Sequence, residues 1–340
     1  MKIRQSSAHV RKTLLTRMLI AVLALAIVLA GIVFGVRLLD RSAPSEATFG
    51  NLEGRFDKPA ITYQGKKYVR NTNLKSYLFL GVDSGENGSA QDGDYRSGGQ
   101  CDFLLLMVID SEHKTVRRVQ IDRDTMAEIT VLGVLGNELG TSKMQICLAH
   151  GFGDGLQQSC KFSQQAVERL LGIQIDGYFS MNLNGIVTLN DLLGGVTVTL
   201  EDDFSHIDPA MTLGATLTLH GEQAETYVRG RMNVGDGTNE ARMKRQRQFL
   251  NAAMGMVVGK AKDDAGFIGT LFDGLKTYTV TDLTRGKMIN EANKASKFDS
   301  DVILTLSGEH VIGADGFVEF HADTEATTDM VLDVFYDPEA

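Results

Sequence analysis

The sequence predicts a three-layer α/β/α domain built on one mixed central sheet. Short apolar runs of strand length alternate with helical stretches along most of the chain, which is the pattern of an α/β fold. The 340 residues are 43% hydrophobic and 23% charged, which is enough for one full core. We find neither an internal repeat nor a coiled-coil pattern.

The N-terminal region predicts a membrane anchor. Residues 1–17 carry five basic residues and no acid, and an uncharged apolar run follows from Met18 to Val36. At about 1.5 Å per residue the run falls just short of a hydrocarbon layer of roughly 30 Å, so flanking residues complete a transmembrane helix over 18–37. The basic tail predicts a cytoplasmic N-terminus and an extracytoplasmic remainder, hence a single-pass protein of the cell membrane. The alternative is a cleaved signal peptide, but the run is too long and no clear cleavage site follows.

Residues 38–73 predict an extracytoplasmic stalk, because glycine, proline and serine recur there with little apolar periodicity. The stalk ends in a short strand pair, ITYQGKKYVR, with its turn at Gln64-Gly65. The compact domain is predicted over residues 74–338.

Three apolar runs predict the first strands of this domain: YLFLGV (Tyr77 to Val82), FLLLMVID (Phe103 to Asp110) and VRRVQI (Val116 to Ile121). The polar segment SEHKT is short enough to join the second and third as a hairpin. The first run ends in Asp83 and a long glycine-rich loop, and loops of that length are usually functional or mobile.

Helical signals follow. We expect Ser163 to cap the helix QQAVERLL, which Gly172 ends. A strand YFSMN, a helix IVTLNDLLGG and a strand VTVTL come next, and a longer helix runs from Arg242 to about Lys262. A helix in TRGKMINEANKAS and late strands in VILTL and FVEFH complete the domain.

Charge and composition limit the partners. The net charge is −9, the pI is near 5.3 and tryptophan is absent, so we expect no nucleic-acid partner, and any polyanion must be met by a local patch. There are three cysteines and no CxxC motif. In an extracytoplasmic domain Cys147 and Cys160 form either a loop-closing disulfide or two buried thiols.

The stretch from Gly221 to Gln248 carries a positive net charge, whereas the whole chain is negatively charged. In an extended segment Arg229 and Arg231 would project to one side, and on a helix Arg242, Arg245 and Gln246 share one face. Such charge runs are most often a solvated helix face. Here a glycine- and asparagine-rich loop separates the two groups, which suits a two-walled cationic pocket, and guanidinium groups match phosphate oxygens in geometry and charge.

Other charged residues fall at strand ends. Asp83 ends one strand and Asp102 begins the next, so both carboxylates meet at one edge of the sheet, either as loop-capping groups or as ligands of Mg²⁺. Arg123 follows the third strand between two acids, either in a structural ion pair or in a substrate contact. Lys143 is a weaker candidate for the same cleft. His150 and His220 stand alone and are expected to be structural.

In this order, the motifs LFLGVDS, CDFLLLMVID, VQIDRDT, SKMQICLAHG, LLGIQIDGYFSMN, LNDLLGGVTV, LHGEQAETYVRGR and ARMKRQRQFL resemble those of the LytR–CpsA–Psr family of extracytoplasmic phosphotransferases. The resemblance covers the chain from about Leu74 to Asp337, plus the anchor. It implies that Asp83 and Asp102 hold Mg²⁺ against a pyrophosphate. It further implies that Arg123, Lys143, Arg229, Arg231, Arg242 and Gln246 line the phosphate pocket. We expect catalytic roles for Arg123, Arg231 and Arg242, and substrate binding by Lys143, Arg229, Gln246 and, from the shared helix face, Arg245.

The chain departs from the family pattern at three places. The acid expected three residues before Arg242 is Asn239, with Asp236 and Glu240 nearby. The usual Ser-Asp-Thr is Cys101-Asp102-Phe103, and the usual proline before Arg-Asp-Thr is Asp122. The general base is therefore not identified by the motifs.

The function implied is transfer of a glycopolymer from a polyprenyl-pyrophosphate carrier to a peptidoglycan sugar hydroxyl, expected to be the 6-hydroxyl of N-acetylmuramic acid. Two alternatives stay open. One is a membrane-tethered protein that binds a polyprenyl phosphate or an anionic polymer without turnover, which Asn239 favours. The other is a hydrolase that uses water in place of the sugar. Nothing in the sequence identifies the glycopolymer.

Overall fold

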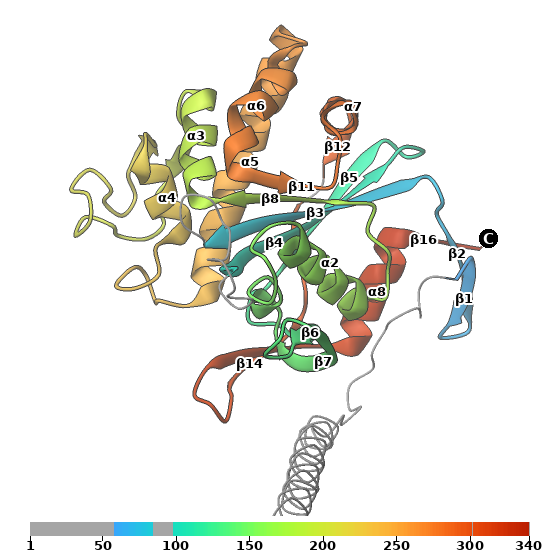
Figure 1. Cartoon of the computed structure of the whole chain (residues 1–340). Coiled ribbons are helices and arrows are strands. Elements are labelled where there is room, and N and C mark those ends of the chain that lie inside the picture. Colours follow the sequence, from blue (N-terminus) through green and yellow to red (C-terminus); the bar gives the residue numbers. More distant parts are fainter. Residues whose placement is uncertain (1–57, 84–97, 301, 340) are drawn as a thin grey trace, which may run out of the picture. The chain divides into compact units, whose positions relative to one another are not determined.

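The computed structural model describes residues 58–83, 98–300 and 302–339 (Figure 1). The strands of the main sheet are β3 (Leu74–Asp83), β4 (Gln100–Asp110), β5 (Thr115–Ile121), β8 (Tyr178–Asn182), β11 (Thr279–Thr281), β12 (Asp299–Ser300) and β13 (Leu304–Thr305). The other strands are β1 (Ala60–Tyr63), β2 (Lys66–Arg70), β6 (Met126–Leu132), β7 (Glu138–Gln145), β9 (Thr197–Thr199), β10 (Thr216–Thr218), β14 (Gly308–Ile312), β15 (Val318–Ala322) and β16 (Tyr336–Pro338).

The helices are α2 (Gln157–Leu171), α3 (Leu183–Leu193), α4 (Glu222–Arg229), α5 (Asn239–Asp263), α6 (Phe267–Leu275), α7 (Arg285–Ala295) and α8 (Thr324–Phe335). Two short 3-10 helices, η1 and η2, cover Ile146–Ala149 and Lys276–Tyr278.

The central sheet is mixed. Its order is β11-β8-β3-β4-β5-β12, and β13 also pairs with β5. Strands β3, β4 and β5 run antiparallel to one another, whereas β8 is parallel to β3, and β12 and β13 are parallel to β5. The predicted mixed α/β class is confirmed.

Alternate residues of the central strands pack into different cores, because side chains alternate between the two faces of a strand. On one face Leu78 and Leu104 pack with Val167 of α2 and Val331 of α8. On the other face Tyr77, Met107 and Ile109 form a smaller cluster that Met254 of α5 and Ala295 of α7 adjoin. Figure 1 shows the result: α2 and α8 lie on one side of the sheet, and α3, α5, α6 and α7 lie on the other.

A further cluster fixes the arginine-bearing helices. Tyr227 of α4 and Phe249 of α5 are buried with Val196, Val198 and Leu219 next to and within the β9–β10 hairpin. Burying side chains of this size stabilises the packing by roughly 1.5–3 kcal/mol each. The end of α4 and the start of α5 are therefore held against the same small sheet.

Most predicted elements are present, with two local corrections. Ser163 does not cap α2: the helix begins six residues earlier, where Asp154 accepts the backbone N–H groups of Gln158 and Ser159, and the Ser163 hydroxyl donates to the carbonyl of Ser159. The segment around Arg229 is helical and not extended, since Arg229 is the last residue of α4.

The predicted strand pair before the domain is present. Gln64 and Gly65 adopt φ values of 48° and 78°, the left-handed geometry that a two-residue hairpin turn needs. Strand β16 pairs with β2, which ties the hairpin to the C-terminal end of the chain. The domain boundary at Leu74 stays a prediction.

The predicted basic tail (1–17), the anchor (18–37) and most of the stalk lie outside the described residues. Within the part of the chain that the structure describes, no helix is long and apolar enough to cross a membrane.

Candidate functional site

A β-bulge presents Asp102. In the β3–β4 ladder Gly81 lies opposite Phe103 and Val82 lies opposite Cys101, so Asp102 is an extra residue in β4. A bulge bends the strand and re-aims its side chains, and bulges are frequent beside active sites. A Cβ on Gly81 would lie 2.9 Å from the Cβ of Phe103, so glycine permits this close approach. The Asp102 side chain remains partly exposed, whereas Cys101 beside it is fully buried.

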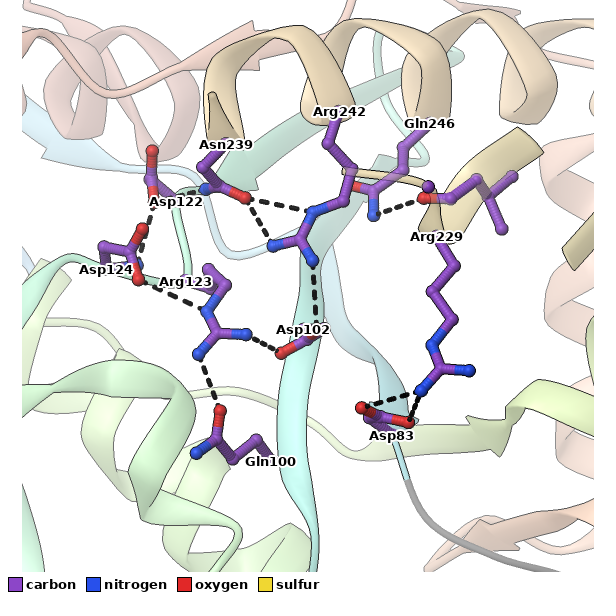
Figure 2. Close-up of polar contacts among 12 residues, drawn as sticks. Asp83, Gln100, Asp102, Asp122, Arg123, Asp124, Arg229, Asn239, Arg242 and Gln246 are labelled. Carbon is purple, nitrogen blue, oxygen red and sulfur yellow. Dashed lines mark hydrogen bonds and ion pairs between the residues drawn. The ribbon is translucent and has the colours of Figure 1, made fainter. Parts of the chain in front are cut away.

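Asp102 bridges two arginines that come from different elements (Figure 2). Its Oδ1 accepts from Arg123, which follows β5, and its Oδ2 accepts from Nη1 of Arg242, in the first turn of α5, at 3.1 Å. Arg123 also donates to Gln100 Oε1 at 2.6 Å and to Asp124 Oδ1 at 3.2 Å. The structure therefore brings Asp102, Arg123 and Arg242 together, as the sequence predicts.

The start of α5 fixes Arg242. The side chain of Thr238 caps the helix by accepting the N–H of Ala241 at 3.1 Å. Asn239 Oδ1 then accepts from Nε of Arg242 at 3.1 Å, and Asn239 Nδ2 donates to Oδ1 of Asp122 at 2.7 Å. Arg242 is only 4% exposed. Burial lowers the pKa of its guanidinium, and the charge of Asp102 opposes that effect.

The second wall lies at the C-terminal end of α4. Arg229 Nη2 contacts Oδ1 of Asp83 at 3.1 Å, with both side chains largely exposed. Asp83 pairs in register with Gln100, and Gln100 and Asp102 both bind Arg123, so Asp83 and Asp102 border one space. The two acids meet at one edge of the sheet, as expected.

Arg231 differs from its neighbours. It is exposed, and among residues 58–83, 98–300 and 302–339 no ion pair of Arg231 is present. Desolvation raises the pKa of Asp124, and the positive charge of Arg231 opposes that rise. Burial lowers the pKa of Arg242, and the same charge adds to that lowering, so Arg231 acts on the same space.

Asp124 and Gln100 are site residues that the sequence reasoning did not select. Asp124 is buried, and desolvation followed by the charge of Asp122 raises its pKa, while Arg123 opposes the rise. The i, i+2 spacing of Gln100 and Asp102 on one strand was the available signal for Gln100.

Arg245 has a structural role in place of the predicted substrate contact. Its side chain is 2% exposed and binds Asp202 and the carbonyls of Tyr227 and Gly230, and it lies over the ring of Phe204. Its donors therefore face protein groups and hold the segment between Arg229 and Arg231.

Gln246 lies in the protein interior, whereas Lys143 lies on an exposed strand. Gln246 is buried and accepts from Gln120 at 3.1 Å. It donates to the carbonyl of Val228 at 3.3 Å (Figure 2). Lys143 lies on the exposed strand β7, opposite Glu128. Substrate binding by these two residues stays a prediction.

The three cysteines are buried and unpaired, so the disulfide alternative for Cys147 and Cys160 is wrong. Cys160 contacts His150 instead, with 3.8 Å between Sγ and Nε2, and Cys147 adjoins Arg123. Nδ1 of His150 lies 2.8 Å from the carbonyl oxygen of Gly98, which confirms the structural role expected for this histidine.

The chain is similar in sequence to known proteins of bacterial cell walls and biofilms. The chain is 27% identical over 270 residues to the polyisoprenyl-teichoic acid–peptidoglycan teichoic acid transferase TagU of Bacillus licheniformis, covering 78% of each chain. It is 28% identical over 211 residues to Biofilm regulatory protein A of Streptococcus mutans, covering 59% of this chain but only 49% of that protein.

A solved structure shares the fold. The structure of TagT bound to LI-WTA matches this chain with a TM-score of 0.59 and 20% identity, over 77% of this chain and 90% of that one. A structure of TagT from Bacillus subtilis matches as well. The sequence model of the LytR_cpsA_psr family matches residues 46–331. With most of its length matched, the chain belongs to the LytR_cpsA_psr family.

Proposed function

We propose that this protein is an extracytoplasmic phosphotransferase that moves a glycopolymer from a polyprenyl-pyrophosphate carrier to a hydroxyl group of peptidoglycan. The observation that carries the proposal is the bridge of Asp102 between Arg123 and Arg242, with Arg229 and Arg231 beside it. The similarity to the teichoic acid transferase of Bacillus licheniformis supports this class of reaction.

The arginines suit a pyrophosphate. Phosphoryl transfer requires mainly that the phosphates be positioned and that the growing charge on their oxygens be neutralised. Arg123 and Arg242 are held by Asp102, and Arg229 is held by Asp83, so the guanidinium groups are oriented before substrate binds. Arg231 supplies a further positive charge at the mouth.

The proposed reaction is a single displacement. The oxygen of the acceptor hydroxyl forms a bond to the phosphorus that carries the glycan. The bond from that phosphorus to the bridging oxygen breaks, and its electron pair leaves on polyprenyl phosphate. A sugar phosphodiester is formed, and the hydroxyl proton must go to a base.

We propose that Mg²⁺ is bound here jointly by the two carboxylates and the substrate phosphates. In the described part of the chain no group of three or more acidic, histidine or cysteine side chains converges on a metal position. Mg²⁺ is, however, commonly bound by one or two carboxylates together with water and substrate phosphates. Asp83 and Asp102 meet that requirement, because a carboxylate oxygen that accepts from an arginine retains a second lone pair. Bound there, Mg²⁺ would neutralise charge on the phosphate oxygens.

The test is a product assay on the full-length protein in nanodiscs, with a synthetic polyprenyl-pyrophosphate-linked disaccharide and peptidoglycan fragments. Release of polyprenyl phosphate together with a new phosphodiester, abolished by EDTA and restored by Mg²⁺, is the expected result. Release that is independent of the acceptor would identify a hydrolase. Binding of the donor without release would identify a protein without turnover, and either result would overturn the proposal.

A further inference from the structure

A histidine from the end of the chain reaches the same edge of the sheet. Strand β13 pairs parallel with β5, with Leu304 opposite Val119 and Thr305 opposite Gln120. The following strand β14 therefore starts beyond the carboxyl end of β5, next to the turn that carries Arg123. There, Nε2 of His310 lies 2.9 Å from Oδ2 of Asp122.

The contacts of Asp122 are the basis for assigning the proton of the neutral His310 ring to one nitrogen. Oδ1 of Asp122 accepts from Nδ2 of Asn239 at 2.7 Å and from the N–H of Asp124 at 2.8 Å. A carboxylate only accepts hydrogen bonds, so with Asp122 in that form Nε2 of His310 is assigned as the donor to Oδ2. In the neutral ring Nδ1 is then the acceptor atom.

The ring of His310 is oriented but not enclosed. It packs on Phe320, with centroids 4.8 Å apart, and the N–H of Phe320 is bound to the carbonyl of Asp124 at 2.8 Å. The His310 side chain is 37% exposed, against 7% for Asp122. No hydrogen bond of His310 Nδ1 occurs within the residues that the structure describes. An oriented imidazole with a buried carboxylate behind it and an open acceptor atom is the arrangement of a general base.

The pair is linked to both arginines of the site. Asn239 binds Asp122 through its Nδ2 and Arg242 through its Oδ1. Asp124, whose N–H binds Asp122, accepts from Arg123 through its side chain at 3.2 Å. One residue therefore separates Asp122 from each guanidinium group that adjoins Asp102.

We propose that His310 is the general base of the transfer reaction and that Asp122 positions it. This inference rests on the proposed function. Nδ1 takes the proton of the acceptor hydroxyl as its oxygen bonds to phosphorus, and the leaving electron pair departs on polyprenyl phosphate. The imidazolium formed is stabilised by Asp122. The carboxylate that the family resemblance leads us to expect at position 239 is thus supplied from Asp122, one hydrogen bond away.

Several charged groups surround this pair. Asp122 and Asp124 come from the turn after β5, and α5 contributes the neutral Asn239 and, beyond it, Arg242. Glu309 and His321 face each other across the β14–β15 hairpin, and they alternate with His310 and Phe320, so they lie on the other face of the hairpin.

The test compares His310→Gln and His310→Ala with His321→Gln, a matched histidine on the same hairpin. The full-length protein is assayed from pH 5 to 9 with the disaccharide donor and peptidoglycan fragments. We expect His310→Gln to lower kcat roughly 100-fold or more, as for loss of a general base, and to remove the acid limb of the pH profile. Donor binding should be unchanged, and His321→Gln should match the wild type. Added imidazole should restore activity to His310→Ala, which a purely structural role would not allow.

The outcomes separate this inference from the proposed function. If the wild type transfers the glycan and His310→Gln retains its rate and pH profile, the inference is overturned while the function stands. If His310→Gln is unstable, the imidazole arm decides, and absence of rescue in folded His310→Ala counts against the base. If the wild type does not transfer, the proposed function itself fails and the inference with it.

Discussion

Asn239 donates a 2.7 Å hydrogen bond to Asp122, and both side chains are buried. These are two of the positions at which the sequence departs from its family pattern. In the structure they are hydrogen-bond partners: Asp122 contributes the carboxylate and Asn239 contributes the amide. An amide can donate to a carboxylate, whereas two carboxylates at this distance would have to share a proton.

Exchanging the two groups tests their coupling. Asn239→Asp alone should lower the free energy of unfolding at pH 7.5 by about 2 kcal/mol, the scale of a lost hydrogen bond to a charged group. The loss should shrink at pH 5, because the like charge raises the pKa of one acid in the folded state and proton binding then favours folding.

Combining Asn239→Asp with Asp122→Asn should recover at least about 1 kcal/mol of that loss in a double-mutant cycle measured by urea unfolding. Asn290→Asp, at an exposed position of α7, is the control and should change stability by less than about 0.5 kcal/mol. Strict additivity of the two buried changes would contradict the proposed partnership.

Arg242→Ala should abolish most of the transferase activity. It removes a guanidinium group from the proposed phosphate space while Arg123 continues to neutralise Asp102. We expect kcat/KM to fall by roughly 10²–10³, the range for loss of one oriented donor. Arg285→Ala removes an exposed ion pair between Arg285 of α7 and Asp273 of α6 and should leave the rate unchanged. Equal rates for the two variants would exclude Arg242 from the chemistry.

Replacing the buried Arg245 should destabilise the protein far more than replacing its exposed neighbour Lys244. Arg245→Ala leaves Asp202 and the carbonyl of Gly230 without their partner, and breaking such a buried pair costs about 3–5 kcal/mol. Lys244 is exposed and pairs with the exposed Glu201, so Lys244→Ala should leave the stability almost unchanged. Denaturant unfolding of both variants measures the difference, and similar midpoints would refute the structural role of Arg245.

The thiols should be unreactive in the native protein. Burial raises the pKa of Cys147 and of Cys160 to about 12, so at pH 8 only about one thiol in 10⁴ is the reactive thiolate. Ellman's reagent should therefore label the native chain very slowly and should find all three cysteines after denaturation without reductant. Recovery of a single thiol under denaturing conditions would show that a disulfide had been present.

His150 should make stability depend on pH. Burial lowers its pKa, so below about pH 6.5, the ordinary value for histidine, the unfolded chain binds a proton that the folded chain does not. This contribution to stability is complete above that pH and is lost as the pH falls toward the folded-state pKa. Urea unfolding at pH 7.5 and 5.5 should show a smaller difference for His150→Gln than for the wild type. The control His206→Gln, at an exposed position, should show the same difference between the two pH values as the wild type.

The sequence alone determined the class of fold and several of the charged residues that meet at the site. The strands β3, β4 and β5 and the long helix α5 are visible in apolar runs and helical spacing, because burial imposes a period on local sequence. The gathering of arginines against a net charge of −9 marked the region around α4 and α5, and the order of motifs indicated the family.

Tertiary structure decided the roles of individual residues. Arg242 and Arg245 look equivalent on a helix face, yet packing turned Arg242 toward Asp102 and enclosed Arg245 against Asp202 and Gly230. The pairing of Asp122 with Asn239 and His310 joins residues more than a hundred positions apart. Such contacts depend on how strands and helices dock, and no local pattern encodes which distant side chain will lie within hydrogen-bond distance.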